Sequence, residues 1–385
     1  MNKFKKHKVL YIIDTLETGG AEKSLVAITS MFKTITPIFV QVYPGSGLKD
    51  LLLRNNIEVY DLQIETGYNF KVALSNLIPL VLKIKPDIIH TTLFKSDIIG
   101  RKLKKHYNVP LVNSLVNNSY IKQRYNNLDF ISKFKLYLVQ QYDKYSSRSV
   151  DLFISNSNAI KFTNAKALNI PERKIKVIHR GRELKDFTDI DLSSLENLRN
   201  ELNLHDKTIF LNVSRLLERK GQLDLLRSFK SIINNDPQSI LLIAGEGEYR
   251  SVLEDYIFKN KLKKNIILLG NRTDIPELLS VSDFFVFPSW YEGLPGALIE
   301  AMMSNTPIIA SNIPENLECI DKNCAEIFEK GNVDSLIRSL DTSVSNKNMM
   351  IAKAEKAREI AIKKFSISNI SEEYENTYRT LLLKK

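Results

Sequence analysis

The chain has 385 residues, of which 43% are hydrophobic and 26% charged, and its formal net charge is +11. This length exceeds one ordinary hydrophobic core and fits two domains of roughly 150–200 residues each. Apolar runs are far shorter than the roughly 20 residues of a spanning helix, and Cys319 and Cys324 are the only cysteines. These features exclude a bundle of spanning helices, a disulfide framework and a cysteine-based zinc site.

The charge is concentrated in the first half of the chain. Residues 1–180 carry 28 Lys and Arg against 13 Asp and Glu, and the remainder carries 27 against 31. A basic half suggests an anionic membrane surface or nucleic acid as a partner. We expect no nucleic acid, because the sequence holds no recognisable helix-turn-helix, zinc finger or RNA-binding module. The basic N-terminus lacks the apolar region of a signal peptide, so we expect a cytoplasmic chain. Peripheral binding to the inner face of the cell membrane is an option.

Short apolar runs alternate with helical stretches along the first 180 residues. Each run is bounded by turn residues, which is typical of a buried parallel strand. The predicted strands are 9–13, 38–42, 88–90, 111–113 and 152–155, and the predicted helices are 21–31, 71–84 and 97–106. Gly19 and Gly20 join the first strand to the first helix, where a backbone without side chains can approach a ligand closely.

Lysines and aromatic residues mix most densely over residues 120–145. Phe130, Phe134, Tyr137, Leu138 and Gln141 follow helical spacing. Two interpretations stay open: an amphipathic helix with a cationic margin that lies on a membrane, or a core-facing helix with a solvated lysine face.

A second alternating series follows an acidic junction near residues 177–193, which we expect to have little regular structure. Asp189 and Asp191 have the spacing of a metal-binding pair but lack partner carboxylates, so we predict a turn or cap there and no metal. The predicted strands are 209–213, 240–244, 266–269, 284–287 and 307–310, and the predicted helices are 222–234, 249–260, 275–280 and 296–304. Two such series predict an α/β protein with two Rossmann-like domains facing across a cleft.

The most informative segment follows the strand at 284–287. A turn of Gly293, Leu294, Pro295 and Gly296 leads into a helix, with Glu292 before the turn and Glu300 inside the helix. Unpaired N–H groups at a helix N-terminus favour phosphate, and the two carboxylates would bind flanking hydroxyls. Sugar, diphosphate and ribose in that order describe a nucleotide-sugar. The competing interpretation is an ordinary amphipathic helix with two surface glutamates.

This segment resembles the E-x7-E motif of the retaining family 4 glycosyltransferases, which have the GT-B fold. Residues 212–221 are similar to the family's R-x4-K element, which implies that Arg215 and Lys220 grip the donor diphosphate. Residues 19–22 resemble its GGAE loop, where acceptor and donor phosphate meet. The resemblance places its base-contacting loop at Gly270, Asn271 and Arg272.

The resemblance also implies domain limits. Residues 1–180 would form the acceptor-side domain and 181–365 the nucleotide-sugar domain, with a C-terminal helix at 366–385 crossing back onto the first. The first domain departs from the family pattern, because Thr92 and Val116 stand where relatives often have histidine. His90, Asn117 and Asn118 are the nearby polar candidates, and Arg180, where asparagine is frequent, could bind acceptor phosphate.

These implications define an expected function. We expect a retaining, metal-independent hexosyltransferase without a cofactor, in which Arg215, Lys220 and Glu292 are catalytic. The donor would be a nucleotide-diphosphate sugar, with UDP favoured. The acceptor hydroxyl would belong to a lipid-linked glycan in surface polysaccharide assembly. Because of Thr92 and Val116, a non-catalytic GT-B partner subunit remains the alternative.

Overall fold

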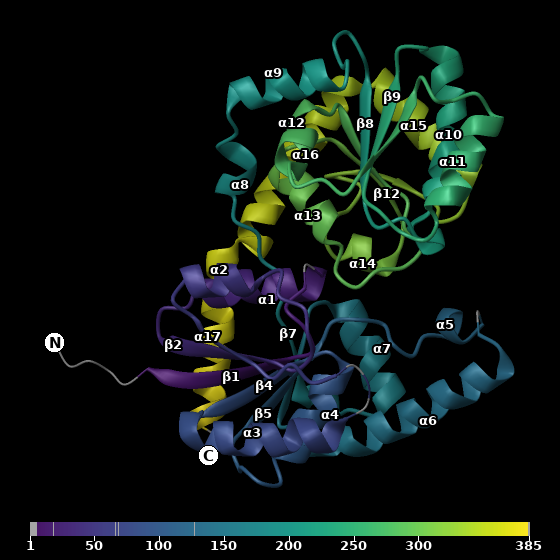
Figure 1. Cartoon of the computed structure of the whole chain (residues 1–385). Coiled ribbons are helices and arrows are strands. Elements are labelled where there is room, and N and C mark those ends of the chain that lie inside the picture. The colour runs from purple at the N-terminus through teal and green to yellow at the C-terminus, as the bar shows by residue number, and fades with distance from the viewer. Residues whose placement is uncertain (1–5, 18, 66, 68, 127, 384–385) are drawn as a thin grey trace. The chain divides into compact units, whose positions relative to one another are not determined.

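The computed structural model describes residues 6–17, 19–65, 67, 69–126 and 128–383. The chain divides into two compact units: unit 1 comprises Met1–Gly181 and Ile367–Lys385, and unit 2 comprises Arg182–Ser366. Each unit contains a parallel sheet with helices on both faces (Figure 1). The predicted α/β class with two Rossmann-like domains is therefore confirmed.

The described part of unit 1 forms a seven-stranded sheet in the order β3-β2-β1-β4-β5-β6-β7. Its strands are β1 (His7–Ile13), β2 (Ile35–Gln41), β3 (Glu58–Asp61), β4 (Ile88–Thr92), β5 (Leu111–Leu115), β6 (Leu152–Ser155) and β7 (Ile175–Val177). The strand order reverses between β1 and β4. Such a switch point is where open α/β sheets bind ligands, beyond the carboxyl ends of the strands.

Helices cover both faces of this sheet. They are α1 (Gly20–Ser30), α2 (Lys49–Arg54), α3 (Phe70–Ile84), α4 (Phe94–Leu103), α5 (Lys122–Asn126), α6 (Phe130–Ser146), α7 (Asn158–Leu168) and α17 (Ile367–Leu383). Successive residues of β1 point into the two cores on opposite faces of the sheet. Leu10 packs with α3 and α7 on one face, and Tyr11 packs with α1 and α17 on the other. The last helix of the chain thus supplies part of the core of unit 1.

In its described part, unit 2 forms a six-stranded sheet in the order β10-β9-β8-β11-β12-β13. Its strands are β8 (Ile209–Val213), β9 (Ile240–Ala244), β10 (Ile266–Gly270), β11 (Phe284–Phe287), β12 (Ile308–Ser311) and β13 (Glu326–Phe328). Here the order reverses between β8 and β11, so the loops that follow these two strands lie at the switch point.

The helices of unit 2 enclose two cores, one on each face of the sheet. They are α8 (Lys185–Thr188), α9 (Leu192–Glu201), α10 (Gln222–Asn235), α11 (Arg250–Lys259), α12 (Ile275–Val281), α13 (Gly296–Met303), α14 (Pro314–Leu317), α15 (Val333–Ser345) and α16 (Lys347–Phe365). Phe210 packs with α10, α11 and α15, and its neighbour Leu211 packs with α12, α13 and α16. The strand period of two therefore divides the apolar residues between the two faces.

The predicted strands occur where expected, but three strands were missed. These are β3, β7 and β13, and each lies at an edge of its sheet. Edge strands are short and half-exposed, so their apolar signal is weak. The junction was expected to have little structure, yet it contains α8. Asp191 caps α9 by accepting a hydrogen bond from the Ser194 N–H at 3.1 Å, which confirms the predicted cap.

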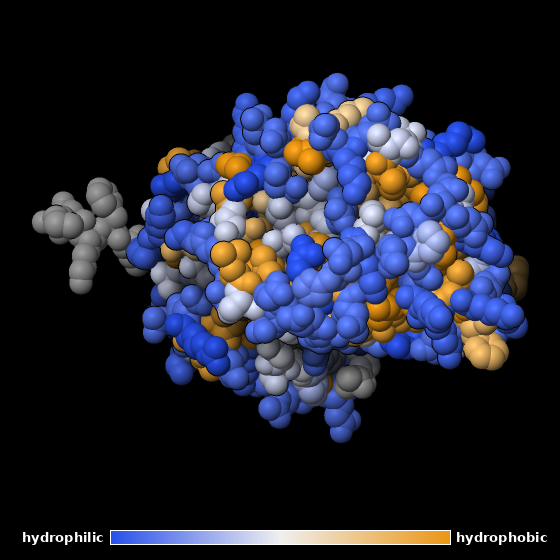
Figure 2. Space-filling view, turned by 90° about the horizontal axis from the view of Figure 1, so that it is seen from above, coloured by the Kyte–Doolittle hydropathy of each residue, from blue (hydrophilic) through white to orange (hydrophobic). Residues whose placement is uncertain are grey.

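The surface carries mainly hydrophilic side chains, with hydrophobic ones gathered in patches (Figure 2). The aromatic stripe of α6 faces outward, with Phe130 84% exposed and Phe134 56% exposed. The interpretation of this segment as a core-facing helix is therefore wrong. Among the helices of the described residues, none is both long and apolar enough to cross a membrane.

Candidate active site

The loop after β8 brings two cations to the switch point of unit 2. Arg215 is exposed, whereas Lys220 is buried at the end of a 3-10 turn. The Gln222 amide donates a 3.0 Å hydrogen bond to the Arg215 carbonyl and so holds the loop in shape. Gly221 is left-handed (φ 69°), and a Cβ atom there would lie 2.2 Å from the Pro288 carbonyl oxygen. Glycine is thus required for this loop to pack against the chain that leaves β11.

Lys220 and Glu292 form a buried ion pair between the loops that follow β8 and β11. The Lys220 ammonium lies 2.5 Å from the Glu292 carboxylate. Burial lowers the pKa of Lys220, and the Glu292 charge offsets part of this decrease. Burial alone would raise the pKa of Glu292, but Lys220, together with Ser289 and Arg219, outweighs it and the net pKa lies below the usual value. The ion pair therefore fixes the position of the Lys220 amino group at the switch point before any ligand binds.

Arg219, between Arg215 and Lys220 in sequence, also belongs to this cluster. Its guanidinium stacks 5.0 Å from the centre of the Tyr291 ring and donates a 3.0 Å hydrogen bond to the Tyr291 carbonyl. It also lies 3.9 Å from Glu292. Stacking on an aromatic face and binding a carbonyl are ordinary uses of the planar guanidinium.

The turn after β11 presents the N-terminus of α13. Pro295 is the N-cap residue, and the helix begins at Gly296. Leu294, which follows Gly293, is buried in the core and so anchors the turn to unit 2. Backbone N–H groups of the first helical turn lack partners within the helix, so this terminus can accept an anion.

Glu300, one helical turn further on, already has a cationic partner. Arg182 donates a 2.8 Å hydrogen bond to its carboxylate, and both side chains are 20% exposed. A Cβ atom on Gly296 would meet the same guanidinium at 2.4 Å. Arg182 is a site residue that the sequence analysis missed. The only available signal was its place in the Arg180-Gly181-Arg182 triplet at the domain junction.

The loops after β9 and β10 form the next edge of the site. Gly245 and Gly270 have positive φ angles of 143° and 71°. A Cβ atom on Gly245 would lie 2.0 Å from the Ser214 carbonyl, so this turn must come close to the loop after β8. Arg272 pairs with Asp274 at 2.5 Å, whereas Asn271 is exposed. The expected base contact of this loop stays a prediction.

In unit 1, Gly19 and Gly20 begin α1 at the other switch point. Gly19 is the N-cap residue, and a Cβ atom on it would lie 2.3 Å from the Glu22 carboxylate. The Arg180 guanidinium lies 3.4 Å from the equivalent position on Gly20. Burial raises the pKa of Glu22, and the charge of Arg180 opposes this increase. Arg180 is therefore placed beside the first turn of α1.

A hollow in unit 1 lies beyond the carboxyl ends of its central strands. It is lined by Ala21, Ser24, Thr92, Ser114, Val116, Asn156, His179 and Arg180, among others. The Asn156 side-chain oxygen is buried and has no hydrogen-bond partner among the described residues. Val116 thus lies in the same hollow as Arg180. The side chains of Asn118 and Asn164 instead connect the Val116–Asn118 segment to α7.

His90 is a buried structural residue. Its Nδ1 lies 2.6 Å from the Tyr378 hydroxyl and its Nε2 lies 2.8 Å from Ser114 Oγ. Burial lowers its pKa to about 3, so the ring is neutral near pH 7. With both nitrogens engaged, His90 is not available as a general base. No cluster of metal-ligating side chains occurs within the described ranges.

Two parallel-sheet units with polar loops at both switch points define the GT-B class of glycosyltransferase. Two family models match the chain: glycosyltransferase family 4 over residues 39–186 and glycosyl transferases group 1 over residues 194–364. The chain therefore belongs to the family 4 glycosyltransferases, as the E-x7-E segment predicted.

Curated relatives and a solved structure support this assignment. The chain is 30% identical to the UDP-Gal:alpha-D-GlcNAc-diphosphoundecaprenol alpha-1,3-galactosyltransferase of Escherichia coli, covering 81% of this chain and 80% of that protein. It is 28% identical to the N,N'-diacetylbacillosaminyl-diphospho-undecaprenol alpha-1,3-N-acetylgalactosaminyltransferase of Campylobacter jejuni, with 74% and 77% covered. HepE from Anabaena in complex with UDP-glucose shares the fold, with a TM-score of 0.83 at 20% identity over 97% of this chain and 99% of HepE.

Proposed function

We propose that the chain is a retaining, metal-independent glycosyltransferase that moves a sugar from a UDP-sugar to a hydroxyl of a lipid-diphosphate-linked glycan. The observation that carries this proposal is the arrangement at the switch point of unit 2. There the exposed Arg215, the buried Lys220–Glu292 pair and the N-terminus of α13 follow two adjacent strands. Such a site suits a diphosphate whose charge increases as it leaves.

Each residue has a stated role in this proposal. Arg215 and Lys220 bind the diphosphate, and the backbone from Gly293 to Gly296 binds phosphate and sugar. Glu292 holds sugar hydroxyls while its charge keeps Lys220 protonated, and Glu300 binds the ribose. Asn271 and its loop neighbours contact the base.

The chemistry follows a front-face substitution. The bond between the anomeric carbon and the diphosphate oxygen breaks, and the acceptor oxygen bonds to the same face of the sugar. The departing phosphate oxygen takes the acceptor proton, so UDP leaves and no side chain must act as base. This scheme requires positioning and charge stabilisation, which agrees with a neutral, fully hydrogen-bonded His90.

The acceptor proposal rests on the relatives and on unit 1. The two relatives named above are described as acting on diphosphoundecaprenol-linked sugars. Arg180 beside Gly20 provides a cation and a helix N-terminus for an acceptor phosphate. Asn117, which follows Val116 of the hollow in sequence and is exposed, is a candidate for acceptor hydroxyls.

Thermal unfolding with excess UDP, GDP or ADP tests the donor site. A ligand at about 100 times its Kd adds roughly 2.7 kcal/mol of stability, which shifts Tm by a few degrees. We expect a shift with UDP that Arg215→Ala abolishes. Because Arg215 is exposed, its replacement should leave the unliganded Tm unchanged. No shift with any nucleotide would contradict the proposal.

Turnover separates catalysis from the non-catalytic alternative. Purified protein with UDP-sugar and a diphosphate-linked acceptor should release UDP in the presence of EDTA, and NMR should show the donor's anomeric configuration in the product. A nucleotide-induced shift without turnover on any acceptor would favour a non-catalytic partner subunit. An inverted product would overturn the retaining mechanism.

A further inference from the structure

Among the described residues, the outer face of α6 carries more exposed large apolar side chains than any other helix or strand. Of the 21 large hydrophobic side chains that are exposed in the described part of the chain, seven lie on this one helix. They are Phe130, Ile131, Phe134, Tyr137, Leu138, Tyr142 and Tyr145, with exposed fractions from 41% to 84%. We call these seven side chains the α6 patch. A patch this dense marks an interaction site on most soluble proteins.

The α6 patch follows helical geometry. Phe130, Phe134 and Leu138 are four residues apart, so they lie on one face, with Tyr137 and Tyr145 beside them. Residues on the opposite face, such as Leu136 and Val139, are half-buried. The helix is therefore amphipathic, but its large aromatic side chains point away from the domain and not into it.

Basic residues border the α6 patch on both sides. Lys133 and Lys144 lie along one margin, and Lys135 lies along the other. The preceding α5 adds the exposed Lys122 and Arg124. Long lysine side chains beside aromatic rings suit the boundary between lipid tails and charged headgroups.

Acidic groups do not oppose this charge. From residue 122 to 146 the sequence contains only Asp129 and Asp143 as acids. Asp129 is the N-cap residue of α6 and accepts a hydrogen bond from the Ser132 N–H at 3.1 Å. Asp143 is buried on the inner face. The outer face therefore has the charge of a surface that binds anionic lipid headgroups.

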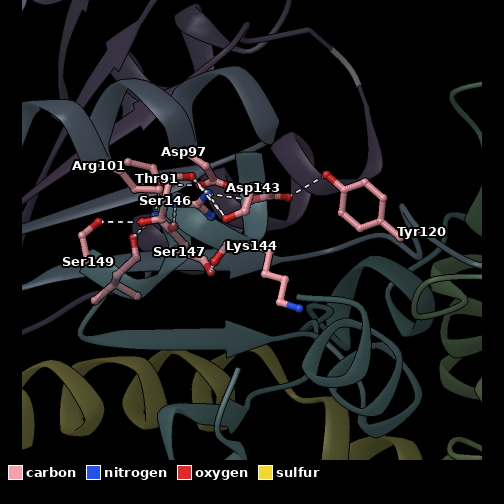
Figure 3. Close-up of polar contacts among 11 residues, drawn as sticks. Thr91, Asp97, Arg101, Tyr120, Asp143, Lys144, Ser146, Ser147 and Ser149 are labelled. Atoms are coloured by element: carbon pink, nitrogen blue, oxygen red, sulfur yellow. Dashed lines mark hydrogen bonds and ion pairs between the residues drawn. The ribbon is translucent and has the colours of Figure 1, made fainter. Parts of the chain in front are cut away.

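Polar contacts hold α6 in this orientation (Figure 3). Arg101 of α4 pairs with Asp143 at 2.5 Å and donates a 2.9 Å hydrogen bond to Ser146. The Tyr120 hydroxyl donates to the other Asp143 oxygen at 2.7 Å. A buried charge without its partner is costly, so Asp143 must stay on the inner side. The helix cannot turn its apolar face inward without breaking this pair.

We propose that the α6 patch docks the chain on an anionic membrane surface, with the aromatic side chains inserted among the lipids and the lysines at the headgroups. This inference deepens the proposed function, because a lipid-linked acceptor is reached only at a membrane. The biological role of this docking depends on the proposed function. Its evidence is the exposure, the charge and the fixed orientation of α6.

Vesicle sedimentation with the full-length chain tests the proposal. We expect binding to phosphatidylcholine vesicles that contain half phosphatidylglycerol, and much weaker binding to pure phosphatidylcholine. Phe130→Ser should lower the partition coefficient about tenfold, as expected for loss of one inserted aromatic side chain. The matched control is Phe258→Ser on α11 in unit 2, which replaces a phenylalanine that is 68% exposed and should leave binding unchanged.

A charge variant tests the electrostatic part. Lys133→Gln with Lys135→Gln should reduce binding to the anionic vesicles by more than tenfold at physiological salt, because each lysine near such a surface contributes about fivefold. Lys261→Gln with Lys264→Gln removes the same charge from exposed positions of unit 2 and should have little effect. Equal losses in the two pairs would mean that only net charge matters and would overturn the proposal.

A fluorescence measurement tests directly whether the α6 patch inserts among the lipids. The chain has a single tryptophan, Trp290, so Phe134→Trp adds one reporter on the α6 patch. Brominated lipids should quench this new emission. Unquenched emission on bound vesicles would overturn the proposal. So would a concentration-dependent dimer that Phe130→Ser abolishes while vesicle binding persists, because the α6 patch would then bind a second copy.

The outcome is independent of the enzymatic assay. The vesicles contain neither donor nor acceptor, so a failure of binding concerns α6 alone. Turnover with a detergent-dispersed acceptor then tests the proposed function. Phe130→Ser should retain the UDP-induced thermal shift, since α6 belongs to unit 1 and the nucleotide site to unit 2.

Discussion

The two units build similar sheets but arrange their polar groups differently at the switch point. In unit 2 the cations Lys220 and Arg182 are paired with carboxylates and lie close to a helix N-terminus. In unit 1, the ring of His90 in β4 binds both the Ser114 hydroxyl of β5 and the Tyr378 hydroxyl. The difference teaches that similar sheets can place a buried ion pair at the switch point in one unit and a neutral hydrogen-bond network among the central strands in the other. Four experiments test this contrast.

The largest effects on stability and activity should come from removing the Lys220–Glu292 pair, first one residue and then both. Lys220→Met leaves the buried Glu292 carboxylate without its nearest cation, with Arg219 at 3.9 Å, and should cost about 3–5 kcal/mol of unfolding free energy, with turnover reduced about 1000-fold. The double variant with Glu292→Met should regain most of the stability and none of the activity. Urea unfolding and UDP release measure the two properties. A double variant that is active would show that the pair is structural only.

Glu375 offers the corresponding test in unit 1. One of its oxygens accepts hydrogen bonds from the N–H groups of Lys33 and Ile35 at 2.9 Å, and from both the N–H and the hydroxyl of Thr34. Glu375→Ala should cost about 3 kcal/mol, because these backbone donors lose a charged acceptor. Glu373→Ala, on the same helix, removes only a 42% exposed partner of Lys176 and should cost under about 1 kcal/mol.

Two spectroscopic signals can show which unit the Glu375→Ala substitution destabilises. Trp290 lies in unit 2, so its fluorescence follows the unfolding of that unit, whereas circular dichroism follows both. We expect the circular dichroism transition to move to lower urea while the Trp290 transition stays in place. A parallel shift of both signals would mean that the units unfold together.

The pH dependence of stability should reveal the neutral network around His90. Its folded pKa of about 3 lies below the ordinary 6.5, so the unfolded chain takes up this proton first on acidification. The contribution of the neutral His90 ring to the free energy of unfolding is fully present above pH 6.5 and decreases as the pH falls toward 3. Between pH 7 and 5 the wild type should lose about 2 kcal/mol more than His90→Gln. Parallel pH curves for the two proteins would contradict a buried neutral histidine.

The smallest effect should come from Arg182→Gln. The Arg182–Glu300 pair is partly exposed, so its loss should change stability by less than about 1 kcal/mol. UDP should nevertheless bind several-fold more weakly, because Glu300 loses the donor that orients it. Lys259→Gln breaks an exposed pair with Asp255 in the same unit and should leave UDP affinity unchanged. Calorimetric titration gives both affinities.

The sequence predicted most of the fold and the loops of unit 2 that carry the proposed site, because both depend on local signals. Buried parallel strands are continuous apolar runs, and Arg215, Lys220 and Glu292 stand in short motifs next to them. Edge strands such as β3 lack that apolar signal. The contact of Arg182 with Glu300 was missed because it joins residues 118 positions apart. The same is true of His90 and Tyr378, which are 288 positions apart and share no local pattern.

The orientation of α6 shows a further limit of sequence analysis. Its amphipathic spacing fits an inward or an outward apolar face equally well. Only the pairing of Asp143 with Arg101, on another helix, decides between them.

The placement of α17 in unit 1 has a consequence for the order of folding during synthesis. Tyr374 and Tyr378 complete the core around Tyr11, yet they follow unit 2 in the chain and leave the ribosome after it. Residues 182–366 of unit 2 are contiguous in the chain and are all available before α17 emerges. Unit 1, whose strands leave the ribosome before unit 2, is thus completed only after unit 2, and a nascent chain that stops before residue 367 leaves Tyr11 and His90 without Tyr374 and Tyr378.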